Sequence, residues 1–356
     1  MCNSIVPPYL LRHLSQLDRD DLREATEAAQ RALISPFPPR APRPTAVPTS
    51  PPGAVDPTSP DRTISDAHET ETLPGEVVRR EGDEPTGDVT ADEAYDGLGA
   101  TYELFAQVFD RASIDGAGLP LLATVHYGRL YDNAFWDGDQ MVFGDGDGQV
   151  FGRFTASLSV IGHELAHGVT QYTADLVYEG QSGALNESLS DVFGALVEQH
   201  SRGQSAAEAS WLIGEGLFTD QVEGNALRSM KAPGTAYDDD VLGKDPQPAT
   251  MDDYVETSDD NGGVHLNSGI PNHAFYLVAT ALGGNAWDAA GPIWYDALTG
   301  DLASDATFAD FAAATADAAV ERFGDSSPEH DAVLDAWSTV GLPIGDTGND
   351  GTDTES

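Results

Sequence analysis

The chain has 356 residues, 40% of them hydrophobic, so it is long enough to bury one large core or two modest ones. Its 60 Asp and Glu residues against 17 Lys and Arg residues give a formal net charge of −43. A surface this negative repels nucleic acids and acidic membranes, which excludes binding to either as the main function.

The acidic composition favours adaptation to high salt, where dissolved ions screen the repulsion between carboxylates. An acidic protein that works at low salt is the alternative. The single cysteine, Cys2, excludes an intramolecular disulfide. No apolar run is long enough to span a membrane, and the first residues show neither a Sec-type nor a twin-arginine signal, so export would use another route.

The first fifty residues predict a small unit that precedes a linker. Residues 5–11 contain an apolar run, and residues 14–34 carry leucines and alanines at a spacing typical of an amphipathic helix. Residues 36–60 hold ten of the 22 prolines, with serine and threonine between them. Such a segment is extended and easily cut. We therefore expect a propeptide-sized unit at 1–50 and a Pro-rich linker that extends to about residue 61.

The next segment, residues 62–154, is predicted to be rich in β-strands. Short apolar or alternating runs, such as residues 121–127 and 140–143, are separated by Gly-Asp turns. Residues 92–108 interrupt this pattern with helical spacing and predict one long helix. The Gly-Asp repeat at 144–148 is too short for an EF-hand calcium loop, and we interpret it as a turn.

From residue 155 to residue 342 the hydrophobic spacing predicts a mainly helical unit, followed by an acidic tail at 343–356. The expected fold class is therefore α+β, with a β-rich subdomain before a helical one. The predicted helices cover residues 156–174, 184–200, 205–213, 268–282, 286–299, 307–322 and 329–339.

The pentapeptide His163-Glu164-Leu165-Ala166-His167 carries the strongest functional signal. Residues four apart lie on one face of a helix, so both imidazoles can bind one metal ion. The H-E-x-x-H pattern is that of zinc hydrolases, in which the glutamate takes a proton from a water molecule on the metal. An exposed helix with two histidines on its polar face is the alternative that the pentapeptide alone leaves open.

A second acidic pair supplies the ligand that such a site still needs. Catalytic zinc takes three protein ligands and keeps one position open for water. Glu187 and Asp191 are four residues apart on a predicted helix, among apolar residues that argue against a solvated face. We expect Glu187 to complete the zinc site. Asp191, with Asn186 from the same segment, is expected to orient the ligand histidines.

Three segments, in this order along the chain, resemble the thermolysin family of zinc metalloendopeptidases. They are residues 163–167, 186–191 and 260–269, and the resemblance extends over about residues 62–342. Residues 7–11, Pro-Pro-Tyr-Leu-Leu, resemble the short propeptide of the protealysin-type branch of that family. The resemblance implies a thermolysin-like fold with the zinc helix and the cleft between two subdomains. It also implies a zinc endopeptidase made as a self-processing precursor that its propeptide inhibits.

The resemblance also implies roles for residues that lack a signal of their own. The family's catalytic histidine, its orienting aspartate and its oxyanion-binding tyrosine match His265, Asp260 and Tyr178. The residues that bind the substrate backbone match Asn133, Ala134 and Arg228. The pocket for a bulky apolar side chain after the scissile bond matches Phe151, Phe154, Val160 and Leu227.

The family often carries a paired calcium site, which this sequence matches only in part. Glu198 and Glu215 match two of its carboxylates, but Ser159 and Leu212 stand where further acids are found. The resemblance therefore implies at most one Ca²⁺. An inert Cys2 is the default interpretation, and a Cys2 thiolate on the zinc of the precursor is the alternative.

The resemblance implies secretion, with a cytoplasmic precursor as the alternative. The expected partners are peptide or protein substrates and the chain's own propeptide, and the chain is expected to be a monomer. Two other functions compete with an active endopeptidase: a catalytically silent protein that keeps the fold, and a peptidase limited to small peptides. The complete set of zinc, base and oxyanion residues favours the endopeptidase.

Overall fold

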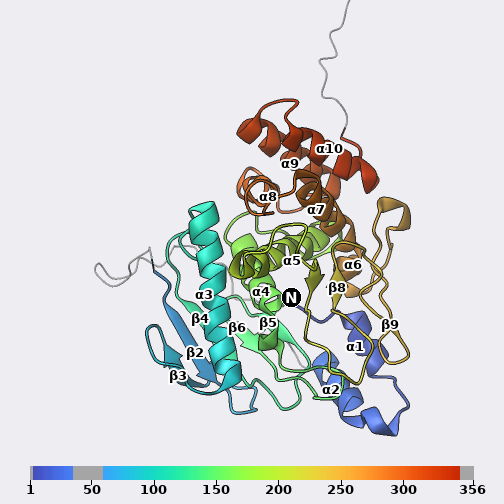
Figure 1. Cartoon of the computed structure of the whole chain (residues 1–356). Coiled ribbons are helices and arrows are strands. Elements are labelled where there is room, and N and C mark those ends of the chain that lie inside the picture. Colours follow the sequence, from blue (N-terminus) through green and yellow to red (C-terminus); the bar gives the residue numbers. More distant parts are fainter. Residues whose placement is uncertain (1–2, 35–58, 345–356) are drawn as a thin grey trace, which may run out of the picture.

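The computed structural model describes residues 3–34 and 59–344 (Figure 1). The N-terminal unit consists of strand β1 (Asn3–Ser4), helix α1 (Pro8–Leu14), the 3₁₀ turn η1 (Asp20–Leu22) and helix α2 (Arg23–Ile34). The helix-like segment predicted at 14–34 thus begins in one helix and ends in another. Cys2, most of the proline-rich linker and the tail beyond residue 344 lie outside the described residues.

Strand β1 forms one edge of a six-stranded sheet, in the order β1-β5-β6-β4-β2-β3. Strand β4 runs parallel to both β2 and β6, and the other neighbours are antiparallel. Because β1 belongs to the N-terminal unit, this unit completes the sheet of the main body. The remaining strands are β2 (Arg62–Asp66), β3 (Glu76–Arg80), β4 (Leu121–Val125), β5 (Ala134–Trp136) and β6 (Met141–Phe143).

Helix α3 (Val89–Phe109) packs against β2 and β4 of this sheet (Figure 1). Its first turn is capped by Asp88, whose carboxylate accepts the backbone N–H groups of Thr90 and Ala91. One long helix within a β-rich segment is what the sequence predicts for this region, and it is confirmed.

Helices α4 (Leu158–Gln171) and α5 (Gly180–Arg202) pack against each other in the middle of the molecule (Figure 1). Almost every residue of both helices is buried. A glycine brings them close, because a Cβ atom at Gly194 would lie only 2.4 Å from the Ser159 carbonyl oxygen. This short separation lets side chains of the two helices converge on one point.

The C-terminal half is built from helices around the paired indoles of Trp294 and Trp337, which stack with ring centroids 6.1 Å apart. Both side chains are fully buried. A helical subdomain after the β-rich one is therefore confirmed. Its helices are α6 (Asp260–Asn267), α7 (Gly269–Leu282), α8 (Ala290–Thr299), α9 (Phe308–Phe323) and α10 (Pro328–Thr339).

The helix predicted at residues 205–213 is wrong. The backbone of Trp211 has a φ of 59°, which no helix accommodates, and its indole N–H donates to the Ala206 carbonyl at 2.8 Å. The segment ends in strand β7 (Leu212–Ile213), which pairs with β8 (Arg228–Ser229). A small hairpin of β9 (Asp238–Asp239) and β10 (Gly243–Lys244) and the 3₁₀ turns η2 (Phe154–Ala156) and η3 (Met251–Asp253) complete the described elements.

Among the residues that the structure describes, no helix combines the length and the apolar character that crossing a membrane requires.

Candidate metal centre and catalytic cleft

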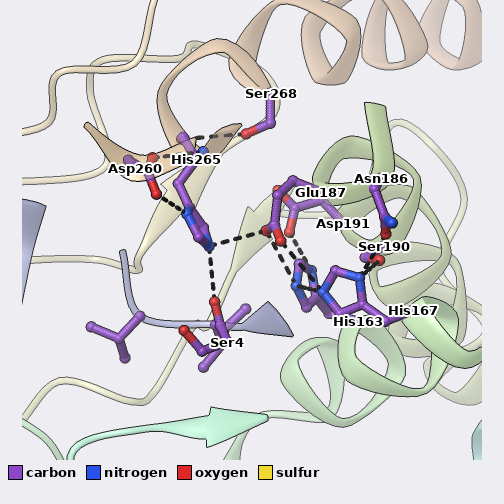
Figure 2. Close-up of polar contacts among 12 residues, drawn as sticks. Ser4, His163, His167, Asn186, Glu187, Ser190, Asp191, Asp260, His265 and Ser268 are labelled. Carbon is purple, nitrogen blue, oxygen red and sulfur yellow. Dashed lines mark hydrogen bonds and ion pairs between the residues drawn. The ribbon is translucent and has the colours of Figure 1, made fainter. Parts of the chain in front are cut away.

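His163 and His167 of α4 and Glu187 of α5 converge at the contact between the two helices (Figure 2). The two histidine Nε2 atoms are 3.1 Å apart, and each lies 3.5 Å from an oxygen of Glu187. All three side chains are at most 1% exposed. Their ligand atoms are close enough together to hold one metal ion. Among the described residues, this is the group of three or more His, Cys, Asp or Glu side chains that meets this condition.

Each histidine ring is held by its other nitrogen. His163 Nδ1 lies 2.7 Å from Asp191 Oδ1, and His167 Nδ1 lies 2.8 Å from Asn186 Oδ1. Both partners are acceptors, so each Nδ1 carries the proton and each Nε2 presents a lone pair. Burial lowers the pKa of His163 to about 4 and that of His167 to about 3, which keeps both rings neutral.

This donor set fits zinc. Two nitrogen lone pairs and a carboxylate point at one another, and Glu187 Oε2 has no hydrogen-bond partner. Such groups repel each other unless a cation lies between them. Two neutral imidazoles and one carboxylate are a known ligand set of catalytic zinc.

Glu164 lies beside this group and is fully buried. Its Oε2 accepts the backbone N–H of Trp136 at 3.0 Å, whereas its Oε1 has no partner. Burial raises the pKa of Glu164, and the charge of Glu187 raises it further. A carboxyl group with a raised pKa binds a proton more readily than an ordinary glutamate does, as a general base requires.

His265 approaches from the opposite wall of the cleft (Figure 2). Its Nδ1 lies 2.7 Å from Asp260 Oδ1, and its Nε2 lies 3.3 Å from the Tyr178 hydroxyl. Burial lowers the pKa of His265, but the negative charges of Asp260 and Glu187 outweigh it and raise the pKa to about 9. The ring is therefore a cation at neutral pH and can donate from both nitrogens. The Tyr178 hydroxyl donates to Glu187 Oε1.

His265 lies on the short helix α6, which a kink interrupts. Asn261, Gly262 and Gly263 have φ values of 51°, 85° and 77°, so a left-handed segment separates Asp260 from His265. This segment folds the chain back and lets the Asp260 carboxylate reach both the ring and the backbone N–H of His265.

Arg228 is fully buried and forms a two-pronged ion pair with Asp191, with both N–O distances at 2.8 Å. Asn272 donates to the same carboxylate at 2.8 Å. Burial raises the pKa of Asp191, but the charge of Arg228 outweighs it and holds the pKa far below its usual range. Asp191 therefore connects the His163 ring to the arginine, a link that the sequence pattern does not reveal.

Strand β1 of the N-terminal unit lies in this cleft (Figure 2). The Ser4 carbonyl oxygen lies 2.9 Å from His265 Nε2, and Arg228 donates to the Ile5 carbonyl at 3.0 Å. The Ile5 N–H donates to the Ala134 carbonyl at 3.2 Å, and the Val6 N–H to Asn133 Oδ1 at 3.1 Å. The N-terminal segment thus contacts the residues expected to bind a substrate backbone.

The residues expected to form the apolar pocket are Phe151, Phe154, Val160 and Leu227. All four are at most 1% exposed and belong to the same hydrophobic core cluster as Ile5 and Val6. The rings of Phe151 and Phe154 lie 5.7 Å apart. Ile5 itself is fully buried, so an aliphatic side chain from the N-terminal unit is enclosed at the cleft.

Comparison with known proteins decides the family. Residues 55–171 match the model of the thermolysin metallopeptidase catalytic domain, and residues 174–342 match that of the alpha-helical domain of the same peptidases. This chain belongs to the thermolysin family of metallopeptidases. It is a metalloendopeptidase, and its buried His-His-Glu group is the arrangement with which this family binds zinc.

Relatives of this thermolysin-family chain cover nearly all of its length. An extracellular metalloprotease of Pectobacterium carotovorum subsp. carotovorum is 50% identical over 342 residues, 96% of either chain. Protease PrtS of Photorhabdus sp. (strain Az29) is 47% identical over 96% of this chain and 92% of its own. The structure of the precursor of protealysin from Serratia proteamaculans is 52% identical, with a TM-score of 0.86 over 96% of this chain and 99% of that one.

The two acids expected to bind calcium in this family member are arranged differently from the zinc ligands. The Glu198 carboxylate pairs with Arg202 at 2.5 Å and is 8% exposed, whereas Glu215 is exposed. Burial raises the pKa of Glu198. An arginine thus already compensates the charge of Glu198, and calcium at this place stays a prediction.

The sequence interpretation missed several residues of the site. Ser190, whose hydroxyl lies 2.9 Å from His167 Nδ1, lies within the segment 186–191 but has no role implied by the resemblance, and Asn272 lies just beyond the segment 260–269. Ser4, Ile5 and Val6 precede the Pro-Pro pair that signals the propeptide, and only their apolar character could have pointed to burial.

Proposed function

We propose that this chain is a zinc endopeptidase that is made as a self-inhibited precursor and cuts before a bulky apolar residue. The observation that carries the proposal is the contact of strand β1 with the catalytic residues. The Ser4 carbonyl of that strand accepts a hydrogen bond from His265 Nε2. The N–H of the next residue, Ile5, donates to the Ala134 carbonyl. The bond between Ser4 and Ile5 therefore has the surroundings expected of a bond to be cut.

Several contacts support this register. Arg228 and Asn133 bond to the backbone on the C-terminal side of that peptide bond, at Ile5 and Val6. The backbone amide of Ile5 is also among the groups that lower the pKa of Glu164, so this amide lies near that carboxyl group. A substrate held in the same way would have its scissile amide between Glu164 and Ala134.

The preference for an apolar residue after the cut rests on Ile5. Its side chain is fully buried, as are those of Phe151, Phe154, Val160 and Leu227, which the family resemblance assigns to the pocket. Burial of an aliphatic or aromatic side chain in an apolar pocket is favourable by roughly 1.5–3 kcal/mol relative to its exposure to water. We therefore expect cleavage before Leu, Ile or Phe.

The chemistry follows from the residues of the two walls. His163, His167 and Glu187 would hold the zinc, which would supply a Lewis acid that makes water more acidic and polarises the substrate carbonyl. Glu164 takes the water proton on Oε1 and later delivers it to the leaving amine. The cationic ring of His265 and the Tyr178 hydroxyl donate to the oxygen of the attacked carbonyl, where negative charge develops.

Inhibition in the precursor is supported by how firmly the N-terminal unit is held. Ile5, Val6, Leu10 and Leu14 are at most 1% exposed. Polar contacts reach the main body too, as between Arg12 and Asp259 and between Ala25 and Gln149. An external peptide cannot reach His265 or Arg228 while β1 is present. Cleavage of the linker between residues 35 and 62 would let the unit leave.

Secretion and adaptation to high salt remain part of the proposal. Relatives from Pectobacterium and Serratia are named extracellular proteases, which supports secretion. The net charge of −43 supports adaptation to high salt, because salt screens repulsion between surface carboxylates. A melting temperature that rises steeply with NaCl, beyond that of a relative with fewer acids, is the expected result.

The experiment that tests the function compares casein with short internally quenched peptides that carry Leu, Asp or Gly after the expected cut. Processed enzyme should cut casein and the Leu peptide, lose activity with a zinc chelator, and recover it with zinc. Hydrolysis of the short peptides alone would indicate a small-peptide hydrolase. No hydrolysis by processed, zinc-loaded enzyme would indicate the silent protein and overturn the proposal.

A further inference from the structure

A second group of buried carboxylates lies outside the catalytic centre. Four buried carboxylate oxygens of Asp132, Asp145 and Asp147 have no hydrogen-bond partner. Both oxygens of Asp132 are among them, and this side chain is 0% exposed. Asp147 is 4% exposed and contributes its Oδ2. Native structures hold few such atoms, because burying a charge without a partner is strongly unfavourable.

The backbone brings these acids together at the open end of the β5–β6 hairpin. Beyond the paired strands, Gly144 N–H donates to the Asn133 carbonyl at 3.0 Å and Gly146 N–H to the Tyr131 carbonyl at 3.2 Å. Asp132 thus lies between two cross-strand bonds, alongside the segment that leads into Asp147. The Gly-Asp repeat, interpreted above as a turn, is this segment.

Asp147 is fixed in one orientation. Its Oδ1 accepts the backbone N–H groups of Gln149, Val150 and Phe151, at 2.5, 2.6 and 3.4 Å. These three donors use only one oxygen and leave Oδ2 without a partner. The nearby Asp145 has its Oδ2 bonded to His126 Nδ1 at 2.8 Å, and its Oδ1 is free of partners.

The surroundings of Asp132 do not neutralise it. Burial raises the pKa of Asp132, and the charge and the side chain of Asp147, which lies close enough to share a proton with it, raise the pKa further, whereas the Asp147 backbone N–H lowers it. Arg31 of α2 exerts an opposing effect, but its guanidinium bonds to the Arg129 carbonyl at 2.9 Å and makes no ion pair with Asp132. Two chemical states would relieve the repulsion: one proton shared by the acid pair, or a bound cation.

We propose that Asp132 and Asp147 form a binding site for a calcium-type divalent cation. The available donors are oxygens of carboxylates, which suit hard cations and not zinc. The loop that leads into Asp147 is folded closely against the residues after it, since the Phe151 and Gly152 carbonyls would both lie 2.4 Å from a Cβ atom at Gly146. Only a glycine leaves room between these oxygens and the loop.

The site is independent of the proposed peptidase activity but adjoins it in the chain. Asp132 immediately precedes Asn133 and Ala134, which bond to the N-terminal strand in the cleft. A cation that ties Asp132 to Asp147 would fix the backbone of the edge on which a peptide is laid. The expected consequence is that calcium stabilises the folded chain even when the catalytic glutamate is absent.

The test titrates calcium into the full-length, zinc-loaded Glu164→Gln chain by calorimetry, in high NaCl with a magnesium excess that suppresses diffuse binding. Asp132→Asn should lose one calcium equivalent per chain and the corresponding rise in melting temperature. The matched control is Asp139→Asn, which removes an exposed acid of the same hairpin. It should retain the calcium equivalent and the rise in melting temperature. In calcium-free buffer, Asp132→Asn should melt no lower than its parent, because an amide relieves the repulsion with Asp147.

Equal calcium stoichiometry in Asp132→Asn and its parent would overturn the proposal. Absence of any calcium binding by the parent would do the same and would leave a shared proton as the state of the pair. If Asp132→Asn does not fold, crystals of the parent soaked with terbium decide. An anomalous peak between the two carboxylates supports the site, and its absence there rejects it.

Discussion

The two walls of the catalytic cleft are built in different ways. The helical wall presents His163, His167 and Glu187 from α4 and α5, and Gly194 fixes the distance between these helices. The opposite wall presents His265 from a segment in which four consecutive residues, 260–263, have positive φ angles. A helix translates sequence spacing directly into position, whereas a loop depends on individual backbone angles and distant partners. The sequence alone therefore indicates the first wall, and only a family resemblance indicates the second.

The largest expected effect comes from the base of the helical wall. Glu164→Gln should lower kcat by about 10²–10⁴-fold, because the amide cannot accept the water proton. Casein hydrolysis by the processed enzyme measures it. The control is Glu103→Gln on the exposed face of α3, which removes the same charge and should leave kcat unchanged. Full activity of Glu164→Gln would remove the helical wall from the chemistry.

On the opposite wall, His265→Gln should lower kcat by about 10²–10³-fold with little change in KM, because it removes a donor to the developing negative charge. Tyr178→Phe should have a smaller effect in the same direction, since zinc and His265 remain. Steady-state kinetics on one peptide separate kcat from KM. A change confined to KM would mean that this wall binds substrate without stabilising the reacting oxygen.

The contact that ties Arg228 to the helical wall can be broken at Asp191. Asp191→Asn should weaken zinc binding by about 10–100-fold, because the His163 ring loses its charged acceptor. It also leaves Arg228 without its ion-pair partner, so the melting temperature should fall. Competition with a zinc chelator gives the affinity, and Asp139→Asn again serves as the control. Unaltered zinc affinity would show that the His163 ring does not depend on Asp191 for binding the metal.

The packing of the helical wall gives a further test. Gly194→Ala places a Cβ atom against the Ser159 carbonyl and should lower the free energy of unfolding by about 1–3 kcal/mol. On α3, the exposed position Glu103 offers a matched helical site, where Glu103→Ala should change stability little. Chemical denaturation measures both. Equal stability of the two variants would mean that the helices can separate without cost.

The smallest effect belongs to neither wall. Hydrogen bonds to Asp145, and also to Asp88, raise the pKa of His126 from 6.5 to about 9 despite partial burial. The folded state thus favours the charged ring. The stabilisation is fully present below pH 6.5 and is lost as the pH rises through about 9. The melting temperature of wild type should fall across this window relative to His126→Gln, and parallel curves would contradict the assignment.

How far the sequence predicts this structure depends on the range of the contacts. Helix α4 follows from apolar spacing, and the zinc group follows from two i,i+4 pairs, which are local patterns. The insertion of β1 beside β5 joins residues more than a hundred positions apart, and no local pattern reports it. The failed helix at 205–213 and the kink before His265 depend on positive φ angles at Trp211 and at 260–263.

The same limit explains why the acid pair of the hairpin was missed. Asp147 lies in a Gly-Asp repeat that predicts a turn, and the turn forms. Its partner Asp132 lies on the preceding side of the hairpin, and only the cross-strand bonds bring the two together. Burial without partners is a property of the folded chain, not of either segment.

Diffraction from crystals of the chain, recorded on both sides of the zinc absorption edge, tests the central claim most directly. One strong anomalous peak should lie about 2.0–2.2 Å from His163 Nε2, His167 Nε2 and an oxygen of Glu187. It should vanish in Glu187→Gln crystals that retain the α4–α5 packing. A zinc peak elsewhere, or no peak at these three residues in protein purified with zinc, would contradict the account.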